Sequence, residues 1–201
     1  MSKRSLLDQD RKLIQIVDGA LAEATHKAGT WLACRPGCTQ CCVGVFAINQ
    51  LDALRLRQGL DKLQKADPDR ARTIRTRAQD AITRLAREFP GDPKTGILSV
   101  EDERGFEAFA NDEPCPVLDP ETGLCNLYDA RPMTCRVFGP PVLGESGLGV
   151  CELCFQGATE KQIAACEMKP DPDDLEGRIL DQLESGTGSK GQTIIAFALC
   201  R

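Results

Sequence analysis

The stretch from Cys34 to Cys42 constrains this chain more than any other, because it places four thiols within nine residues. Pro36 and Gly37 favour a sharp turn, so a short loop can direct several sulfur atoms to one point. Thiolates select zinc, copper(I) or iron–sulfur clusters. The alternative is a set of small buried apolar side chains, which is how free cysteine usually behaves. A hydrophobic core does not need a C-x3-C-x2-C-C pattern, carried here by Cys34, Cys38, Cys41 and Cys42.

A second block of cysteines begins at Cys115 and contains a predicted hairpin. Residues 119–123 have turn composition and are flanked by Leu118 and Leu124. If these two leucines oppose each other, Cys115 and Cys125 lie on one face, and both sulfurs can reach a common inorganic centre. The predicted metal ligands of the two blocks are Cys34, Cys38, Cys41, Cys42, Cys115, Cys125, Cys135 and either Cys151 or Cys154.

Eight grouped thiols are enough for two four-cysteine centres. Adjacent residues rarely bind one metal together, so Cys41 and Cys42 are expected to serve different centres or to bridge two metal ions. Cys166 falls within a helical pattern and Cys200 within an apolar tail, and both are interpreted as non-ligands.

Three arginines close to cysteines are predicted to contact the bound cofactor. Each bound thiolate adds negative charge, and burying that charge requires compensation. N–H donors to sulfur could provide it, although a solvated surface position is the alternative for each. The three residues are Arg35, Arg131 and Arg136.

Whether the eleven cysteines form disulfides or bind metal depends on the cellular compartment. The N-terminal residues lack the apolar segment of a signal peptide, and no apolar run approaches the roughly 18 residues that span a bilayer. We therefore expect a cytoplasmic protein without a membrane partner, where cysteine density indicates metal or redox chemistry. The chain has one histidine, so a metal site must be almost purely thiolate. Its net charge of −5 gives no indication of nucleic acid binding.

Apolar residues at helical spacing predict several helices. One covers 6–28, a second begins after the potential cap Asn49, and a third covers 68–89 with an arginine-rich face interpreted as solvated surface. Further helices are expected at 159–168 and 175–183, whereas 193–199 fits either a strand or a helical turn. The predicted fold is mainly α, with helices around an irregular cysteine-rich metal-binding core and one short β-hairpin. A single domain is expected over 1–201, with the cysteine core at 31–155, the N-terminal helix at 6–28 and a C-terminal helical extension at 156–201.

The ligand spacing leaves iron–sulfur and zinc both open. Zinc usually takes two separated C-x2-4-C pairs, and only Cys151 and Cys154 form one here. Three close cysteines followed by a distant cysteine before proline, as at Cys115, is closer to a ferredoxin arrangement. An iron–sulfur cluster is therefore favoured over Zn²⁺. The C-x3-C-x2-C run also fits radical S-adenosylmethionine enzymes, but Gln40 stands where those enzymes carry an aromatic residue, and a helix-rich chain cannot supply their barrel.

The two blocks together resemble a known family. C-x3-C-x2-C-C followed by C-P-x-L-D, T-G-x-C-x-x-Y and R-P-x-x-C-R is similar to the YkgJ-type cysteine-cluster proteins, a zinc- or iron-chelating CxxCxxCC domain. The resemblance covers about 34–154 and implies metal binding. That family is similar to the flagellin lysine N-methylases, in which an iron–sulfur cluster is implicated.

Three functional hypotheses follow, and the sequence leaves open whether the protein is an enzyme. The first is a 4Fe-4S or related iron–sulfur protein with an electron-transfer or group-transfer role. The second is a zinc-binding structural or interaction module without catalysis. The third, implied only by the resemblance, is an iron–sulfur-dependent protein lysine N-methylase-like enzyme. A protein partner or substrate is expected in each case.

Overall fold

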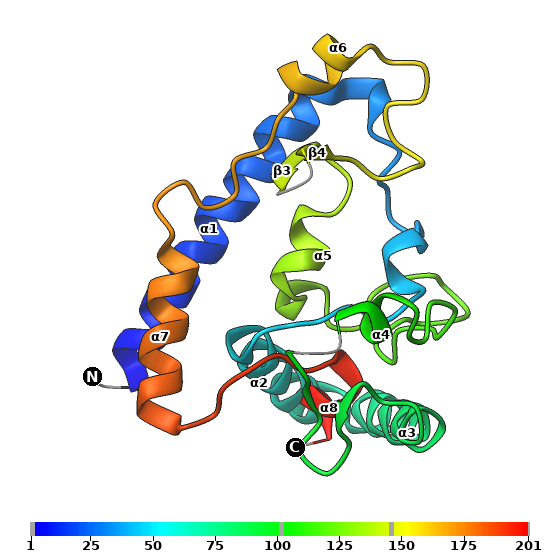
Figure 1. Cartoon of the computed structure of the whole chain (residues 1–201), viewed down its shortest axis with the longest axis vertical. Helices are drawn as coiled ribbons and strands as arrows, with labels where there is room; N and C mark the ends of the chain where they lie inside the picture. The colour runs from blue at the N-terminus through cyan, green and yellow to red at the C-terminus, as the bar shows by residue number, and fades with distance from the viewer. Residues whose placement is uncertain (1–2, 101–102, 145–146, 201) are drawn as a thin grey trace. The chain divides into compact units, whose positions relative to one another are not determined.

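The computed structural model describes residues 3–100, 103–144 and 147–200, and it is mainly α-helical, which confirms the predicted fold class (Figure 1). The chain divides into two compact units. Unit 1 consists of residues 1–35 and 133–188, and unit 2 consists of residues 36–132 and 189–201. The prediction of a single domain stays a prediction.

Three helices form the core of unit 2. They are α2 (Gln50–Ala66), α3 (Pro68–Leu85) and the short α8 (Ile195–Leu199), which settles residues 193–199 in favour of a helical turn. Each of these helices packs against the other two. Fully buried Leu56 and Ile74 lie in the cluster between them, together with Leu199 of α8.

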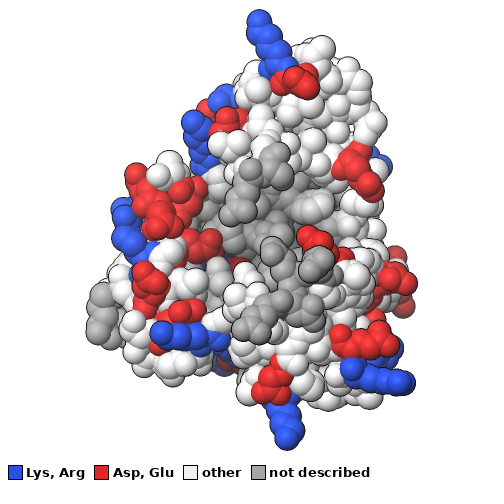
Figure 2. Space-filling model, viewed as in Figure 1, with Lys and Arg blue, Asp and Glu red and all other residues white. Residues whose placement is uncertain are grey.

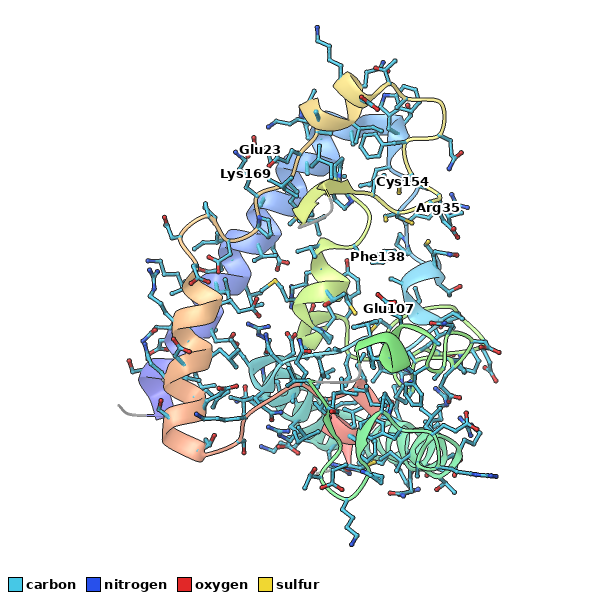
Figure 3. All side chains as sticks on the ribbon, in the orientation of Figure 1. Glu23, Arg35, Glu107, Phe138, Cys154 and Lys169 are labelled. Atoms are coloured by element: carbon cyan, nitrogen blue, oxygen red, sulfur yellow. The ribbon has the colours of Figure 1, made fainter. Side chains whose placement is uncertain are left out.

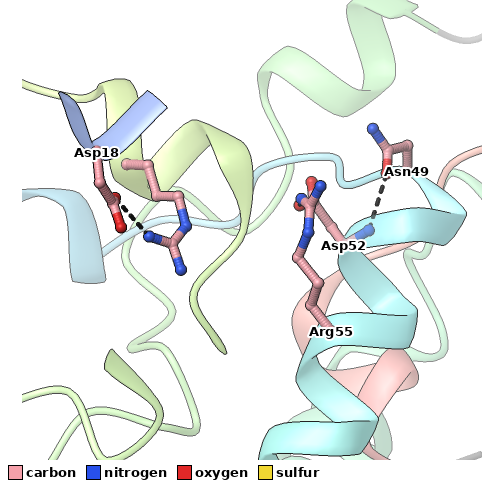
Figure 4. A network of polar contacts seen from close by, with 5 residues as sticks. Asp18, Asn49, Asp52 and Arg55 are labelled. Carbon is pink, nitrogen blue, oxygen red and sulfur yellow. Dashed lines mark hydrogen bonds and ion pairs between the residues drawn. The ribbon is translucent and has the colours of Figure 1, made fainter. Parts of the chain in front are cut away.

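Side-chain caps fix where α2 and α3 begin. The Asn49 side chain accepts a hydrogen bond from Asp52 N at 2.9 Å, which confirms the predicted cap (Figure 4). Asp67 caps α3 by accepting from Arg70 N at 3.0 Å. Within α2, Arg55 Nη1 lies 2.5 Å from Asp52 Oδ1, and both side chains are buried.

The predicted end of α3 at residue 89 is wrong. The helix ends at Leu85, and residues 86–88 form turns before Phe89 and Pro90. A residue that precedes proline is pushed out of the α region, so Phe89 leaves the helical path and packs its ring near Phe197 instead. The arginines of α3 agree with a solvated face, since Arg72 and Arg84 pair with Asp69 and Glu113. Acidic and basic side chains are mixed over the described surface that Figure 2 shows.

The predicted hairpin at residues 117–125 exists only as an isolated bridge, and its predicted register is wrong by one residue. Leu118 opposes Cys125 rather than Leu124. The Asp119 carboxylate accepts hydrogen bonds from Glu121 N and Thr122 N, and Gly123 N donates to Asp119 O. These bonds make the turn one residue longer than predicted. Because side chains alternate between the two faces of a strand, a shift of one residue moves each side chain to the opposite face.

Short antiparallel strands occur in two further segments, one in each unit. In unit 2, β1 (Gly91–Asp92) pairs with β2 (Ile97–Leu98), and in unit 1, β3 (Val142–Gly144) pairs with β4 (Gly147–Gly149). The remaining elements of unit 2 are η2 (Gln40–Cys42), α4 (Glu103–Glu107) and η3 (Tyr128–Ala130).

Unit 1 is built on two long helices that lie side by side, α1 (Lys3–Ala28) and α7 (Leu175–Thr187) (Figure 1). The other elements are η1 (Gly29–Trp31), α5 (Met133–Val137) and α6 (Glu160–Ala165), so helices are present in every segment where one was expected. Arg136 of α5 is buried and donates to Asp18 of α1 at 2.7 Å (Figure 4). Across the described residues, no helix combines the length and apolarity needed to cross a membrane.

Candidate metal centre

The first cysteine block of unit 2 is held against the second by backbone contacts. The short helix η2 carries Cys41 and Cys42, and the carbonyl of Cys42 accepts a hydrogen bond from Cys115 N at 2.8 Å. A bridge between Val43 and Pro114 continues this pairing. Residues more than 70 positions apart in the chain are thereby brought together, as the two-block interpretation predicts.

Cys125 joins them through the turn that follows Cys115. Leu118 N donates to Cys115 O at 3.0 Å, and Leu118 forms the bridge with Cys125. Arg77 of α3 donates from Nη1 to the Leu118 carbonyl at 2.7 Å, which ties this turn to the helical core. Cys115 and Cys125 are half-buried and pack against the core cluster of α2, α3 and α8.

The four thiols of this region influence one another electrostatically. A hydrogen bond from Cys42 lowers the pKa of Cys41 to about 6, and the charge of Arg131 also contributes. The same hydrogen bond, with burial and the nearby sulfurs of Cys41, Cys115 and Cys125, raises the pKa of Cys42. Burial raises the pKa of Cys115 to about 12, and burial also raises that of Cys125. Cys41 is therefore the thiol of this group whose thiolate form the surroundings favour most.

Arg131 lies where the sequence analysis expects a compensating charge. Its guanidinium stacks 3.8 Å from the centre of the Tyr128 ring, and its Nη1 donates to the Tyr128 carbonyl at 3.2 Å. It is close enough to Cys41 and Cys125 to favour both thiolates. Cation–π contact and burial fix the guanidinium beside the sulfurs.

The other two predicted arginines belong to unit 1. Arg136 makes the buried contact to Asp18, and Arg35 is exposed at the end of the segment that leaves η1 (Figure 3). Their donation to sulfur stays a prediction.

The two units divide the eleven cysteines. Unit 2 contains Cys38, Cys41, Cys42, Cys115, Cys125 and Cys200, and unit 1 contains Cys34, Cys135, Cys151, Cys154 and Cys166. The C-x3-C-x2-C-C loop is therefore split after Arg35, with Cys34 on one side and the other three thiols on the other. Whether Cys41 and Cys42 serve different centres or bridge two metal ions stays a prediction.

Within residues 3–100, 103–144 and 147–200, no group of three or more His, Cys, Asp or Glu side chains stands in an arrangement that could hold a metal ion. The chemistry of the donor set nevertheless fits a soft metal, since effects on one another's pKa link Cys41, Cys42, Cys115 and Cys125, and the charge of Arg131 favours the Cys41 and Cys125 thiolates.

The role of Arg77 in positioning this region cannot be predicted from the sequence. The helical pattern indicates a basic face over 68–89, but it does not show which arginine contacts a carbonyl. No signal in the sequence identifies that contact.

A model of the CxxCxxCC family, described as "Putative zinc- or iron-chelating domain", matches residues 33–167. This match covers most of the chain and includes both cysteine blocks, so the chain belongs to that family, which confirms the resemblance on which the metal prediction rests. The family description covers both zinc and iron. No curated protein and no solved structure matches the chain. The resemblance to lysine N-methylases stays a prediction.

Proposed function

We propose that unit 2 binds an iron–sulfur cluster through Cys41, Cys42, Cys115 and Cys125, and that the protein uses it to exchange electrons with a protein partner. The observation that carries this proposal is the backbone pairing of the two cysteine blocks, in which Cys115 N donates to Cys42 O and Leu118 forms a bridge with Cys125. The charge of Arg131 acts on the Cys41 thiol beside them. Four cysteine thiolates are the usual ligand set of such clusters.

The surroundings of the four thiols support an electron-transfer role. Val43 follows Cys42 directly and is 51% exposed, and Tyr128 in η3 is 60% exposed. Exposed apolar side chains beside a cluster offer a partner an area to contact, and the cluster lies close to that surface. Arg131 offsets part of the negative charge that four thiolates bring and can donate N–H groups to sulfur.

Metal binding is expected to draw the sulfurs of unit 2 together, because no described group already has the arrangement of a metal site. The helical core holds the backbone of both blocks close, so side-chain rotation and small loop movements supply most of this change. Cys38 lies in the same loop and stays a predicted ligand.

Zinc is the second candidate, favoured by the four-thiol set itself, since closed structural zinc sites often consist of four cysteines. Protein purified without oxygen distinguishes the two. Iron and sulfide with visible charge-transfer absorption support the iron–sulfur cluster, and a colourless protein with zinc alone assigns a structural module.

The ligand assignment has a matched control within the same unit. Cys125→Ser is expected to remove the visible absorption and the iron, whereas Cys200→Ser, at the exposed end of α8, retains both. Equal metal content in the two variants contradicts the assignment.

A further inference from the structure

Unit 2 has an open hollow that is separate from its cysteine blocks. The hollow has a volume of about 460 Å³ and is lined by residues of α2, α3 and the end of α8, three helices that pack against one another (Figure 1). Binding sites for small molecules commonly have volumes of roughly 300–1,000 Å³. The hollow is therefore large enough to hold a small ligand.

The floor of the hollow is apolar and belongs to the helical core. It contains Leu60 of α2 and Leu199 of α8, which are 2% and 4% exposed and lie in the buried cluster between the helices. Helices that share one core hold their side chains more precisely than loops do. The polar groups above the floor are therefore carried on a rigid support.

Two arginines line the hollow, one from each of the longer helices. They are Arg57 of α2 and Arg75 of α3, and both residues are half-buried. Arg75 Nη1 donates a hydrogen bond to Gln64 Oε1 of α2, which directs the Arg75 side chain toward that helix. Burial raises the pKa of the Cys200 thiol, and the charge of Arg75 acts against this shift. The Arg75 guanidinium is thus close to α2 and also to the end of α8.

The remaining polar groups of the lining leave a surplus of positive charge. Asp61 of α2 brings one carboxylate, so among the described lining residues two guanidinium groups accompany one acidic group. Thr76 and Gln79 of α3 add a hydroxyl and an amide, both of which can donate to an anion. A guanidinium presents five N–H donors in a planar fork that matches the oxygen atoms of carboxylates and phosphates. Positive charge, donors and an apolar floor therefore meet in one hollow.

We infer that this hollow binds a small organic anion, whose carboxylate or phosphate group contacts Arg57 and Arg75 while its apolar part packs on Leu60 and Leu199. The inference goes beyond the proposed metal-binding function and does not rest on it, because the four cysteines proposed to hold the cluster lie outside the lining. It assigns to unit 2 a small-molecule site in addition to the metal centre.

Cys200 provides the measurement, because its exposed thiol is part of the lining and is not a proposed metal ligand. Neutral iodoacetamide alkylates this thiol, and peptide mass spectrometry gives the rate at constant ionic strength. The added probes are phenyl phosphate, benzoate and the uncharged benzyl alcohol. We expect saturable protection of Cys200 by at least one of the two anions and none by benzyl alcohol. The anion that protects at the lower concentration shows whether phosphate or carboxylate is preferred. If neither anion protects, or if benzyl alcohol protects equally, the inference is overturned.

Substitution of the arginines tests the contact with the anion. Arg57→Gln and Arg75→Gln each remove one positive charge and keep a long side chain with good helix propensity. Each is expected to raise the concentration that gives half-maximal protection by roughly tenfold or more. This concentration is compared instead of the alkylation rate, because the charge of Arg75 also acts on Cys200 itself.

The matched control is Arg72→Gln on the same helix. Arg72 is exposed, pairs with Asp69 and lies outside the lining of the hollow, so its substitution is expected to leave protection unchanged. Protection that falls as much in Arg72→Gln as in the other two variants would reflect general surface charge and would overturn the inference. Protection that persists unchanged in both Arg57→Gln and Arg75→Gln would overturn it as well.

Discussion

In unit 2, Cys115 and Cys125 lie at the edge of a helical core, whereas in unit 1, Cys151, Cys154 and Cys166 lie inside a small cluster made largely of loops. Cys115 and Cys125 pack against buried side chains of α2, α3 and α8, which have apolar faces and caps of their own. Around Cys151 and Cys154 the neighbours are the end of α1 and three short segments: η1, the chain after β4, and α6. Metal is therefore expected to complete a formed scaffold in unit 2 and to create much of the local order in unit 1.

Removal of the metal is expected to produce the largest difference between the two units. Structural zinc contributes roughly 10–16 kcal/mol in apparent terms, more than the stability of a typical domain. A chelator is expected to abolish hydrogen-exchange protection over residues 138–168 while amides of α2 and α3 change little. Hydrogen exchange resolved by peptide measures both units in one sample. If both units lost hydrogen-exchange protection to the same extent, their folded structures would depend equally on metal, contrary to this comparison.

A substitution at Gly139 is expected to produce the next largest effect, confined to unit 1. Gly139 has φ = +119°, and an alanine Cβ there would lie 2.6 Å from Cys34 Sγ. Gly139→Ala therefore combines backbone strain of about 1–3 kcal/mol with displacement of the Cys34 sulfur, a predicted metal ligand. Its matched control is Gly147→Ala, with φ = +109° and no atom within 4 Å of the new Cβ. Both variants carry the backbone strain, so protease resistance is expected to fall further for Gly139→Ala, and metal content is expected to fall only for Gly139→Ala.

The corresponding steric test of unit 2 is Gly59→Ala. The added Cβ would lie 2.4 Å from the Ala130 Cβ, so α2 must displace η3 and the adjacent Arg131. Overpacking of this kind costs about 1–3 kcal/mol. The thermal midpoint is expected to fall, whereas Gly19→Ala on α1, with open space around it, is expected to gain roughly 0.5–1 kcal/mol from helix propensity. A Gly59→Ala protein as stable as the Gly19→Ala protein would disprove the close approach.

The smallest effect concerns thiol reactivity in the metal-free protein. Because the pKa of Cys41 is lowered to about 6, its thiolate is present above that pH, and its alkylation rate is expected to rise between about pH 5 and 7. Cys115, whose pKa is raised to about 12, stays unreactive over the same range. Cys42→Ala is expected to shift the Cys41 profile to higher pH, and Arg131→Gln by less. Mass spectrometry of alkylated peptides gives both profiles, and identical rates at Cys41 and Cys115 would refute the assignment.

The sequence predicts what depends on local chemistry and misses what depends on long-range contacts. The start of α2 at Asn49 and the proline at the start of α3 follow from capping rules, and both are present. The family and its metal chemistry follow from cysteine spacing. The hairpin register failed because the hydrogen bonds of Asp119 set the turn length, and several turns fit the same residues.

The placement of individual thiols was less predictable still. Cys166 follows a helical pattern that reads as ordinary packing, and only the fold shows that it shares a cluster with Cys151 and Cys154. The division of the first cysteine loop between the units at Arg35 likewise has no local signal. The spacing of the cysteines indicates that they are metal ligands. Which cysteines lie together depends on the path of the chain in the folded protein.

The order in which the chain visits its two units bears on how such a protein can change over evolution. Residues 36–132 carry the proposed ligands of unit 2, but α8, which contributes Leu199 to the core beneath Cys115 and Cys125, lies beyond unit 1 in the chain. Cys34 is likewise separated from the other unit 1 thiols by all of residues 36–132. A single recombination event cannot transfer either thiol set with its complete scaffold. A contiguous segment that leaves out Cys34 or Leu199 therefore separates residues that the structure places in the same unit.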